Sequence, residues 1–173
     1  MRVVFMGYMG SGKSTIGKKL ARVLKYEFID LDEYISDKER ASIPEIFANR
    51  GEIYFRKKET IYLNEILSSK EDVVLALGGG TPCYASNLNT IKASEETSSF
   101  YLKLSIPSLV KRLFLEKQNR PLISHLETTD ELSEFIGKHL FERTQFYNQA
   151  QYILNADDLT QKDILEDILL KLI

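Results

Sequence analysis

The chain reads Gly7-Tyr8-Met9-Gly10-Ser11-Gly12-Lys13-Ser14 directly after the apolar run at residues 3–6. This stretch fits the phosphate-binding pattern G-x-x-x-x-G-K-[ST], in which glycines let backbone N–H groups surround the phosphates of a nucleotide. In such a loop the lysine reaches the β- and γ-phosphate oxygens, and the hydroxyl of Ser14 takes a Mg²⁺ position. Because a strand-like run precedes the loop and a helical pattern follows it, the sequence predicts a binding site for a nucleoside triphosphate.

Strand-like and helix-like segments alternate along the rest of the chain. Five apolar runs are typical of strands: residues 3–6, 28–31, 73–77, 100–104 and 152–154. Between the first two runs, Ile16, Leu20 and Leu24 fall on one face of a helix over residues 13–24. Continuous apolar strands indicate a parallel sheet that crossover helices cover on both faces. We therefore predict an α/β fold, a three-layer α/β/α sandwich around a five-stranded parallel sheet.

The composition indicates one domain, residues 1–173, with small-molecule partners. With 173 residues, of which 43% are hydrophobic and 28% charged, the chain can form one compact core. The formal net charge of -2, from 23 basic and 25 acidic residues, argues against a general nucleic-acid surface. A single cysteine, Cys83, excludes an intramolecular disulfide, and no apolar run approaches the roughly 18 residues of a membrane span. We expect a cytoplasmic monomer that binds neither nucleic acid nor membrane.

A helical insertion follows the second expected strand. Ser42 and Glu45 form an S-x-x-E capping box, with Pro44 in the first turn, and Gly51 interrupts the pattern before a longer helix that runs to Leu67. This insertion is more than a simple crossover between strands. We expect the acceptor of the reaction to bind here, over about residues 32–69.

Asp30 and Asp32 lie one residue apart at the end of the second expected strand. Open α/β sheets bind ligands at this edge, and alternation would point both side chains the same way. One carboxylate could reach Mg²⁺ through water while the other receives a hydroxyl proton. The alternative is a helix N-cap beside a solvated acid, and the pair alone does not choose between these interpretations.

Arg56 and Glu59 are neighbours on the helix after Gly51, so the acid can hold the guanidinium in place. Beside Phe47 and Phe55, a fixed guanidinium could grip a small, partly apolar carboxylate with two hydrogen bonds. An ordinary salt bridge over core aromatics is the alternative.

Gly78, Gly79 and Gly80 follow the third expected strand. They either let the backbone approach a ligand closely or form a flexible turn. Further along, a polar stretch at about residues 115–129 contains Arg120-Pro121-Leu122 and is predicted to be a mobile lid. Arg120 could neutralise a transferring phosphoryl group, although arginines, including the later Arg143, are often only solvated charges.

Taken in order, these motifs resemble the shikimate kinase family over nearly the whole chain. The resemblance rests on the phosphate loop with Ser14-Thr15, the D-x-D pair, Ile46-Phe47, Gly51-Glu52, Phe55-Arg56, the triple glycine, R-P-L in the lid, and Glu142-Arg143 with Tyr147. It implies a fold like that of nucleoside monophosphate kinases, with a closing lid. It also implies transfer of the γ-phosphate of ATP to the 3-hydroxyl of shikimate, a step towards chorismate and the aromatic amino acids.

The resemblance also implies roles for single residues. Lys13, Asp32 and Arg120 would be catalytic, with Asp32 orienting the reacting hydroxyl or taking its proton. Ser14 and, through water, Asp30 would hold Mg²⁺. ATP would contact Gly10, Ser11, Gly12, Lys13, Ser14, Thr15, Arg112 and Arg120, with Arg112 stacking on adenine. Shikimate would contact Asp32, Arg56, Gly78, Gly79, Gly80 and Arg143, with Glu59 orienting Arg56.

Two other functions stay open on the sequence. A kinase for another polyhydroxy acid, such as gluconate, would need an acceptor region without Phe55-Arg56 and R-P-L. A passive nucleotide-binding protein would need neither an acceptor base nor a lid charge, so Asp32, Arg56 and Arg120 together disfavour it. The segment 155–158 lacks a proline that the resemblance leads us to expect near the adenine.

Overall fold

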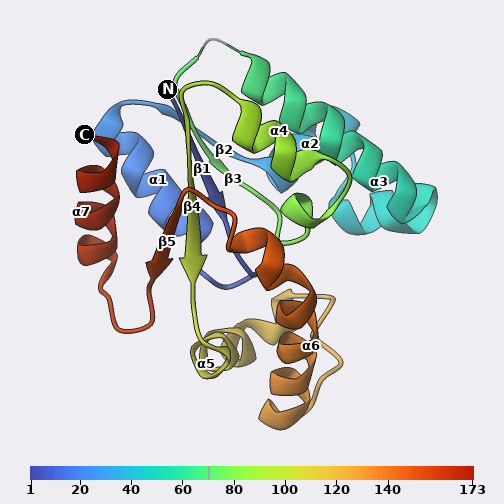
Figure 1. The fold of residues 1–173 in the computed structure, drawn as a ribbon. Helices are drawn as coiled ribbons and strands as arrows, with labels where there is room; N and C mark the ends of the chain where they lie inside the picture. The colour runs from blue at the N-terminus through green and yellow to red at the C-terminus, as the bar shows by residue number, and fades with distance from the viewer. Residues whose placement is uncertain (70) are drawn as a thin grey trace.

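The computed structural model describes residues 1–69 and 71–173 and is built around a five-stranded parallel sheet with the order β2-β3-β1-β4-β5 (Figure 1). The strands are β1 (Arg2–Met6), β2 (Glu27–Asp30), β3 (Val73–Ala76), β4 (Thr97–Lys103) and β5 (Tyr152–Asn155). Every neighbouring pair is parallel, and the register of β1 places Val4 opposite Leu75 of β3 and Ser99 of β4. The predicted three-layer α/β sandwich is confirmed.

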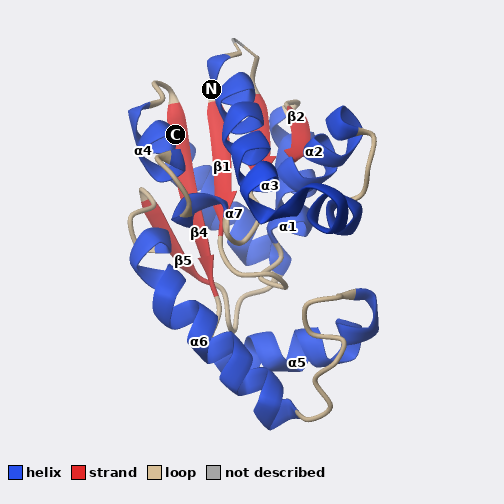
Figure 2. Cartoon of the chain, turned by 90° about the vertical axis from the view of Figure 1, so that its right-hand side faces the viewer, coloured by secondary structure: helices blue, strands red, loops and turns tan. Residues whose placement is uncertain are grey.

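Helices cover both faces of the sheet and one of its ends. The helices are α1 (Lys13–Leu24), α2 (Leu31–Glu39), α3 (Ile43–Ser68), α4 (Asn87–Ala93), α5 (Ile106–Glu116), α6 (Thr129–Tyr147) and α7 (Gln161–Leu172), with 3₁₀ turns η1 (Thr81–Cys83) and η2 (Lys117–Asn119). In Figures 1 and 2, α1 and α7 lie on one face, α2, α3 and α4 lie on the other, and α5 and α6 lie beyond the carboxyl ends of the strands. The α5–α6 pair therefore lies at the edge where open α/β sheets bind ligands.

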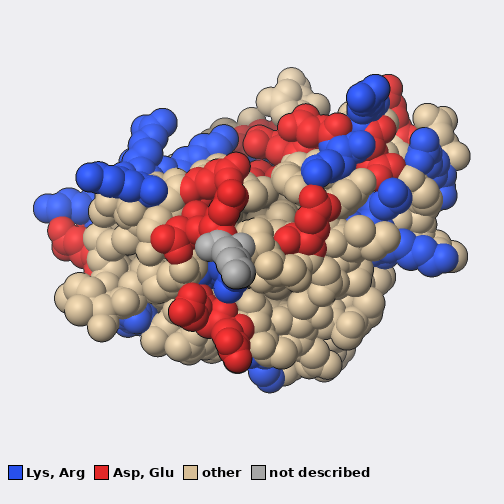
Figure 3. Space-filling view, turned by 90° about the horizontal axis from the view of Figure 1, so that it is seen from above, with Lys and Arg blue, Asp and Glu red and all other residues tan. Residues whose placement is uncertain are grey.

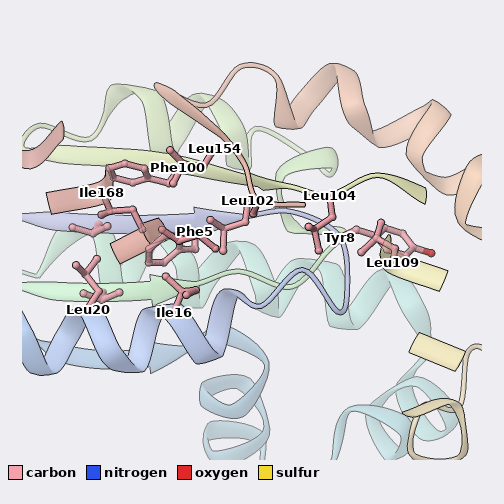
Figure 4. Packing of buried hydrophobic residues seen from close by; sticks show 14 of the residues in the cluster. Phe5, Tyr8, Ile16, Leu20, Phe100, Leu102, Leu104, Leu109, Leu154 and Ile168 are labelled. Atoms are coloured by element: carbon pink, nitrogen blue, oxygen red, sulfur yellow. The ribbon is translucent and has the colours of Figure 1, made fainter. Parts of the chain in front are cut away.

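The inner strands β1 and β3 are apolar over residues 3–6 and 73–76 because both of their faces are buried. On one face, Phe5 and Phe100 pack against Leu20 of α1 and Ile168 of α7 (Figure 4). On the other face, alternate strand residues such as Val4, Met6 and Leu75 pack against Leu31, Ile35 and Leu63 of α2 and α3. This two-sided packing is the physical reason that the apolar runs predict a covered parallel sheet.

The predicted helical insertion is present between β2 and β3. The Ser42 backbone N–H donates to Glu45 Oε2 at 2.8 Å, and the Glu45 N–H donates to Ser42 Oγ at 3.4 Å, which completes the capping box. Gly51 divides α3 with φ 78° and ψ 170°, a conformation that is essentially restricted to glycine. The helix therefore changes direction at this residue, with Arg56 and Glu59 on the longer second part.

The second strand ends one residue earlier than the apolar run predicts. Asp30 caps α2, because its Oδ1 accepts a hydrogen bond from the Asp32 N–H at 3.1 Å. Leu31 then begins the helix instead of ending the strand. Asp32 consequently lies in the first turn of α2, and the expected strand alternation does not set its direction.

The molecular surface carries both signs of charge. In the view from above, basic and acidic side chains are interspersed over the face (Figure 3). Within residues 1–69 and 71–173, none of the helices combines the length and the apolar character that crossing a membrane requires.

Candidate active site

The phosphate loop connects β1 to α1 at the carboxyl edge of the sheet. Gly10 and Gly12 have positive φ values of 76° and 97°, which allow the loop to curl before α1 begins at Lys13. Lys13 is 9% exposed, and its Nζ donates to the backbone oxygens of Gly7 at 2.9 Å and Tyr8 at 3.0 Å. Burial lowers the pKa of Lys13 to about 8, although Asp32 and Asp30 oppose the shift. The loop is thus shaped for phosphates, with a lysine held inside it.

Ser14 and Asp30 form a pair of oxygen donors beside the loop. The Ser14 hydroxyl donates to Asp30 Oδ2 at 2.7 Å, while the other Asp30 oxygen caps α2. Over the described part of the chain, no cluster of three or more His, Cys, Asp or Glu residues could hold a metal ion. A hydroxyl and one carboxylate suit Mg²⁺, which takes oxygen ligands and commonly completes its shell with phosphates and water.

Asp32 lies between the phosphate loop and the triple glycine. Burial raises the pKa of Asp32 to about 6, with further increases from the charges of Asp30 and Glu59, against the opposing effects of Lys13 and Arg56. A carboxylate with this pKa is ionised at neutral pH and can still take up a proton. The environment therefore suits a group that receives a hydroxyl proton.

The three consecutive glycines each face one predicted acceptor residue. A Cβ atom on Gly78 would lie 2.9 Å from Asp32 Oδ1, and one on Gly80 would lie 2.8 Å from Arg56 Nη2. A Cβ atom on Gly79 would lie 3.5 Å from Arg143 Nη1. Side chains at Gly78 and Gly80 would collide with these groups. The turn therefore brings a carboxylate and two guanidinium groups from three helices around one stretch of backbone.

A buried network fixes Arg56. Its Nη1 donates to Glu59 Oε2 at 2.9 Å, and Glu59 is only 1% exposed. The Thr81 hydroxyl donates to Glu59 Oε1 at 2.6 Å, and Asn87 Nδ2 donates to the Thr81 backbone oxygen at 2.9 Å. The ring of Tyr84 covers the guanidinium of Arg56 at 3.9 Å. The pairing of Arg56 with Glu59 follows the expected spacing, whereas the sequence pattern did not indicate Thr81, Tyr84 and Asn87.

Helix α6 supplies Arg143 and ties the glycine turn to the rest of the site. The Tyr147 hydroxyl donates to the Gly79 backbone oxygen at 2.5 Å. The Arg143 guanidinium lies 5.8 Å from the ring centre of Tyr8 in the phosphate loop. The Tyr8 hydroxyl also shares a hydrogen bond of 2.9 Å with Nδ1 of His139, a residue of this helix that the sequence pattern did not indicate either.

Two neighbouring cavities occupy this edge of the sheet. The larger, of about 600 Å³, is lined by the phosphate loop, Ser14, Thr15 and Asp30. The smaller, of about 330 Å³, is lined by Phe47, Phe55, Arg56 and Arg143. Both cavities are lined by Met9, Asp32, Gly78, Gly79 and Arg120. The larger cavity, which could hold a nucleotide, and the smaller cavity, which could hold an acceptor, thus meet at Asp32 and Arg120.

The predicted lid lies between α5 and α6. Arg120 follows η2, and its Nη2 and Nε donate to Glu116 Oε2 at 2.7 and 3.2 Å. Arg120 therefore faces both cavities while it is paired with the last residue of α5. Arg112 and Leu159 also line the larger cavity, and Arg112 Nη1 donates to the Gly10 backbone oxygen at 3.4 Å.

The residues 155–158 contact the first residues of the segment that leads into α5. Asp157 Oδ1 accepts hydrogen bonds from the backbone N–H of Ser105 at 2.9 Å and from its hydroxyl at 3.0 Å. Ser105 is the N-cap of α5, the helix that carries Arg112. The segment 155–158, which lacks the expected proline, is therefore attached to the N-cap of α5 through the carboxylate of Asp157.

Comparison with known proteins gives a consistent result across the chain. The family model described as shikimate kinase matches residues 9–173. The chain belongs to the shikimate kinase family. The shikimate kinase of Flavobacterium johnsoniae is 45% identical over 168 residues, covering 97% of this chain and 96% of the relative.

Solved structures of shikimate kinases superpose over nearly the whole chain. The enzyme from Bacteroides thetaiotaomicron has a TM-score of 0.90 at 38% identity, covering 99% of this chain and 98% of that one. The Acinetobacter baumannii enzyme in complex with shikimate has a TM-score of 0.84 at 34% identity, covering 97% and 90% of the two chains. A gluconokinase from Sinorhizobium meliloti, at 19% identity and a TM-score of 0.63, shares the fold alone.

Family membership establishes the reaction. Shikimate kinases transfer the γ-phosphate of ATP to the 3-hydroxyl of shikimate, which yields shikimate 3-phosphate and ADP in chorismate and aromatic amino acid biosynthesis. This chain is accordingly an ATP-dependent kinase of that pathway.

Proposed function

We propose that phosphoryl transfer takes place where the two cavities meet, with the shikimate 3-hydroxyl directed at Asp32 and the γ-phosphate between Lys13 and Arg120. The observation that supports this proposal most strongly is the triple-glycine turn, which faces Asp32, Arg143 and Arg56 in succession. All of these residues come from one chain, so the reaction needs no partner subunit. We accordingly propose that residues 1–173 act as one domain and as a monomer.

The acceptor carboxylate is held by Arg56 and Arg143. Glu59 and the ring of Tyr84 fix the Arg56 guanidinium, so little side-chain freedom is lost when a carboxylate binds. Phe47 and Phe55, whose ring centres lie 4.8 Å apart, form an apolar wall against the ring of the acceptor. A small carboxylate with one apolar face therefore fits this cavity.

The donor nucleotide occupies the larger cavity. Lys13 leaves the loop carbonyls to contact the β- and γ-phosphates, and backbone N–H groups of Gly10, Ser11 and Gly12 surround the chain of phosphates. Thr15 and Arg112 line the same cavity, where Arg112 would stack on the adenine. Ser14 and, through water, Asp30 would hold Mg²⁺, which would neutralise charge on the phosphates.

Asp32 positions the reacting hydroxyl and receives its proton. Phosphoryl transfer passes through a loose transition state, so positioning and electrostatics contribute most of the catalysis. Above its pKa of about 6, Asp32 is a carboxylate and accepts a hydrogen bond from the 3-hydroxyl. As the hydroxyl oxygen bonds to the γ-phosphorus, the bond between that phosphorus and the bridging oxygen of ADP breaks, ADP leaves with the electron pair, and Asp32 takes the hydroxyl proton.

The lid completes the site when both substrates are bound. Arg120 breaks its hydrogen bonds to Glu116 and contacts the transferring phosphoryl group. There its positive charge stabilises the negative charge that develops in the transition state. Closure of residues 115–129 excludes water, which is otherwise about as nucleophilic as the acceptor hydroxyl. Shikimate binding should therefore favour closure and limit the hydrolysis of ATP.

A coupled ADP-release assay with shikimate, gluconate, quinate and nucleoside monophosphates tests the choice of acceptor. We expect rapid turnover with shikimate and not with the other three acceptors. ³¹P NMR of the product should show a phosphate ester at the 3-hydroxyl of shikimate. Comparable kcat/KM with gluconate would contradict the proposed acceptor cavity. ATP binding without release of ADP for any acceptor would instead support a passive nucleotide-binding protein.

A further inference from the structure

Glu39 lies at the centre of a polar cluster outside both cavities. It is the last residue of α2, and its side chain is only 6% exposed. Its Oε1 accepts hydrogen bonds from the Tyr62 hydroxyl at 2.6 Å and from Lys58 Nζ at 2.9 Å. Its Oε2 accepts from the Tyr54 hydroxyl at 2.5 Å and lies 3.3 Å from Arg50 Nη1. One carboxylate therefore holds four side chains of α3.

These four side chains lie on both parts of the kinked helix. Arg50 precedes Gly51, whereas Tyr54, Lys58 and Tyr62 follow it at intervals of four residues and so share one face. The Arg50 guanidinium also donates to the Tyr54 hydroxyl across the kink. Glu39 consequently fixes the two parts of α3 to each other and to α2.

The stability of this cluster depends on an ionised carboxylate. An acid at the carboxyl end of a helix is unfavourable with respect to the helix dipole, so Glu39 gains no support from α2 itself. Hydrogen bonds from Tyr54, Tyr62 and Lys58 nevertheless lower the pKa of Glu39 to about 2. The charge on Glu39 is balanced by side chains of α3.

Both helices joined at Glu39 carry residues of the proposed site. Asp32 lies in the first turn of α2, about 10 Å from Glu39 along a single short helix. Arg56 and Glu59 lie on the part of α3 that Tyr54, Lys58 and Tyr62 hold. In Figures 1 and 2 the two helices lie side by side over the same face of the sheet.

We propose that Glu39 is a positioning residue, which sets the separation between Asp32 and Arg56 and thereby the fit of the acceptor between them. This inference rests on the proposed function, in which Arg56 binds the acceptor carboxylate and Asp32 its hydroxyl. Glu39 contacts neither substrate and acts only through the orientation of α3.

The variant Glu39→Gln tests this role. Glutamine keeps the shape of the side chain but has one acceptor oxygen for four donors, and it removes the charge that balances Arg50 and Lys58. We expect the KM for shikimate to rise roughly fivefold or more, while the KM for ATP stays within about twofold of the wild-type value. Tyr54→Phe, which removes one of the donors and keeps the ring, should give a smaller change of the same kind.

The matched control is Glu65→Gln. Glu65 joins the same two helices on the exposed side, where it accepts from Tyr34 at 2.9 Å and Lys38 at 3.0 Å, and this substitution should leave both KM values unchanged. Melting temperatures recorded for all variants separate positioning from stability, because a purely structural role lowers the melting temperature without changing the KM for shikimate at 25 °C. Tyr54→Phe combined with Tyr62→Phe replaces Glu39→Gln if that variant does not fold.

The inference is overturned if the KM for shikimate of Glu39→Gln stays within about 1.5-fold of the wild-type value. It is also overturned if the KM values of Glu39→Gln for shikimate and ATP rise together. Arg56→Ala, measured in parallel, separates this outcome from an error in the site. A normal KM for shikimate in Arg56→Ala contradicts the proposed acceptor cavity itself. A raised KM in Arg56→Ala with a normal KM in Glu39→Gln contradicts only the role of Glu39.

Discussion

At the scale of single residues, Asp32 has the most specialised environment. It is placed by the N-cap Asp30, faces Gly78 so closely that a Cβ atom there would have to displace its carboxylate, and has Lys13 and Arg56 among the charges acting on it. Burial and acidic neighbours raise the pKa of its carboxyl group, which costs stability and favours proton transfer. The raised pKa of Asp32 therefore costs stability and fits its proposed role of receiving a hydroxyl proton.

Replacing Asp32 by asparagine should separate chemistry from binding. Asp32→Asn is almost isosteric, so the native fold and the ATP affinity should be retained while kcat falls by about 10²-fold or more. Stopped-flow transfer to shikimate, with ATP affinity from calorimetry, measures both. Asp37→Asn, on the exposed side of the same helix, is the control and should have full activity. Near-normal turnover in Asp32→Asn would exclude the proposed role.

The raised pKa of Asp32 predicts how stability depends on pH. Because the pKa is about 6 in the folded chain against an ordinary value of 3.8, the folded state binds more protons between these pH values. The contribution of Asp32 to stability is therefore greatest below pH 3.8 and is lost as the pH rises through 6. At pH 8, Asp32→Asn should raise the free energy of unfolding by up to about 3 kcal/mol. Urea denaturation at pH 8 measures this change, and a variant less stable than wild type would contradict it.

How far single residues could be predicted depended on whether their partners were local. Arg56 and Glu59 lie three residues apart on one helix, so their spacing indicated that they could pair, whereas the spacing of Asp30 and Asp32 left open that Asp30 caps a helix. Thr81 reaches Glu59 from 22 positions away, and Tyr84 covers Arg56 only after the chain has folded. No local pattern indicates contacts of this kind. The cluster around Glu39 escaped prediction for the same reason.

At the scale of elements, the apolar runs were the most predictable segments. The five runs correspond to β1 to β5, and the runs in β1 and β3 are buried because helices cover both faces of the inner strands, whereas Ile153 of β5 stays partly exposed. The capping box and Gly51 indicated how α3 begins and where it bends. The short elements α2 and α4 have weaker patterns, and the end of β2 was displaced by the cap at Asp30.

The bend in α3 gives a test of backbone strain. A Cβ atom at Gly51 would have no neighbour within 4 Å, so Gly51→Ala meets no steric contact, yet φ 78° with ψ 170° disfavours any side chain. This substitution should lower the free energy of unfolding by about 1 to 3 kcal/mol. Gly137→Ala, in the interior of α6 with its nearest neighbour at 3.7 Å, should raise it by about 0.4 to 1 kcal/mol. Equal effects in urea denaturation would show that the conformation at Gly51 is unstrained.

The lid gives a kinetic test at the same scale. Arg120→Ala should reduce kcat by roughly 10² to 10³-fold, because a cation directed at developing phosphoryl charge is lost, while ATP affinity changes little. Lys111→Ala, an exposed cation on α5, should alter kcat by less than a factor of about three. If Arg120→Ala loses ATP affinity and kcat/KM equally with kcat unchanged, Arg120 contributes uniform binding instead.

At the scale of the whole molecule, the order β2-β3-β1-β4-β5 brings four distant segments to one edge of the sheet. The phosphate loop follows β1, Asp32 follows β2, the glycine turn follows β3, and α5 with the lid follows β4. Parallel strands end at the same edge, which is why residues far apart in the sequence could be predicted to form one site. The sequence did not reveal the division of this edge into two cavities, because it depends on packing of α3 and α6.

Calorimetric titration of shikimate into Arg56→Ala tests the proposal that Arg56 holds the carboxylate of shikimate beside Asp32. The control is Lys57→Ala, because Lys57 is an exposed cation next to Arg56 on α3. This variant should bind shikimate and ATP as the wild type does. In Arg56→Ala we expect shikimate binding to weaken by roughly 2 to 4 kcal/mol, about 30- to 900-fold in Kd, with the Kd for ATP within about twofold of wild type. Unchanged shikimate affinity in Arg56→Ala would show that Arg56 does not hold the carboxylate of shikimate.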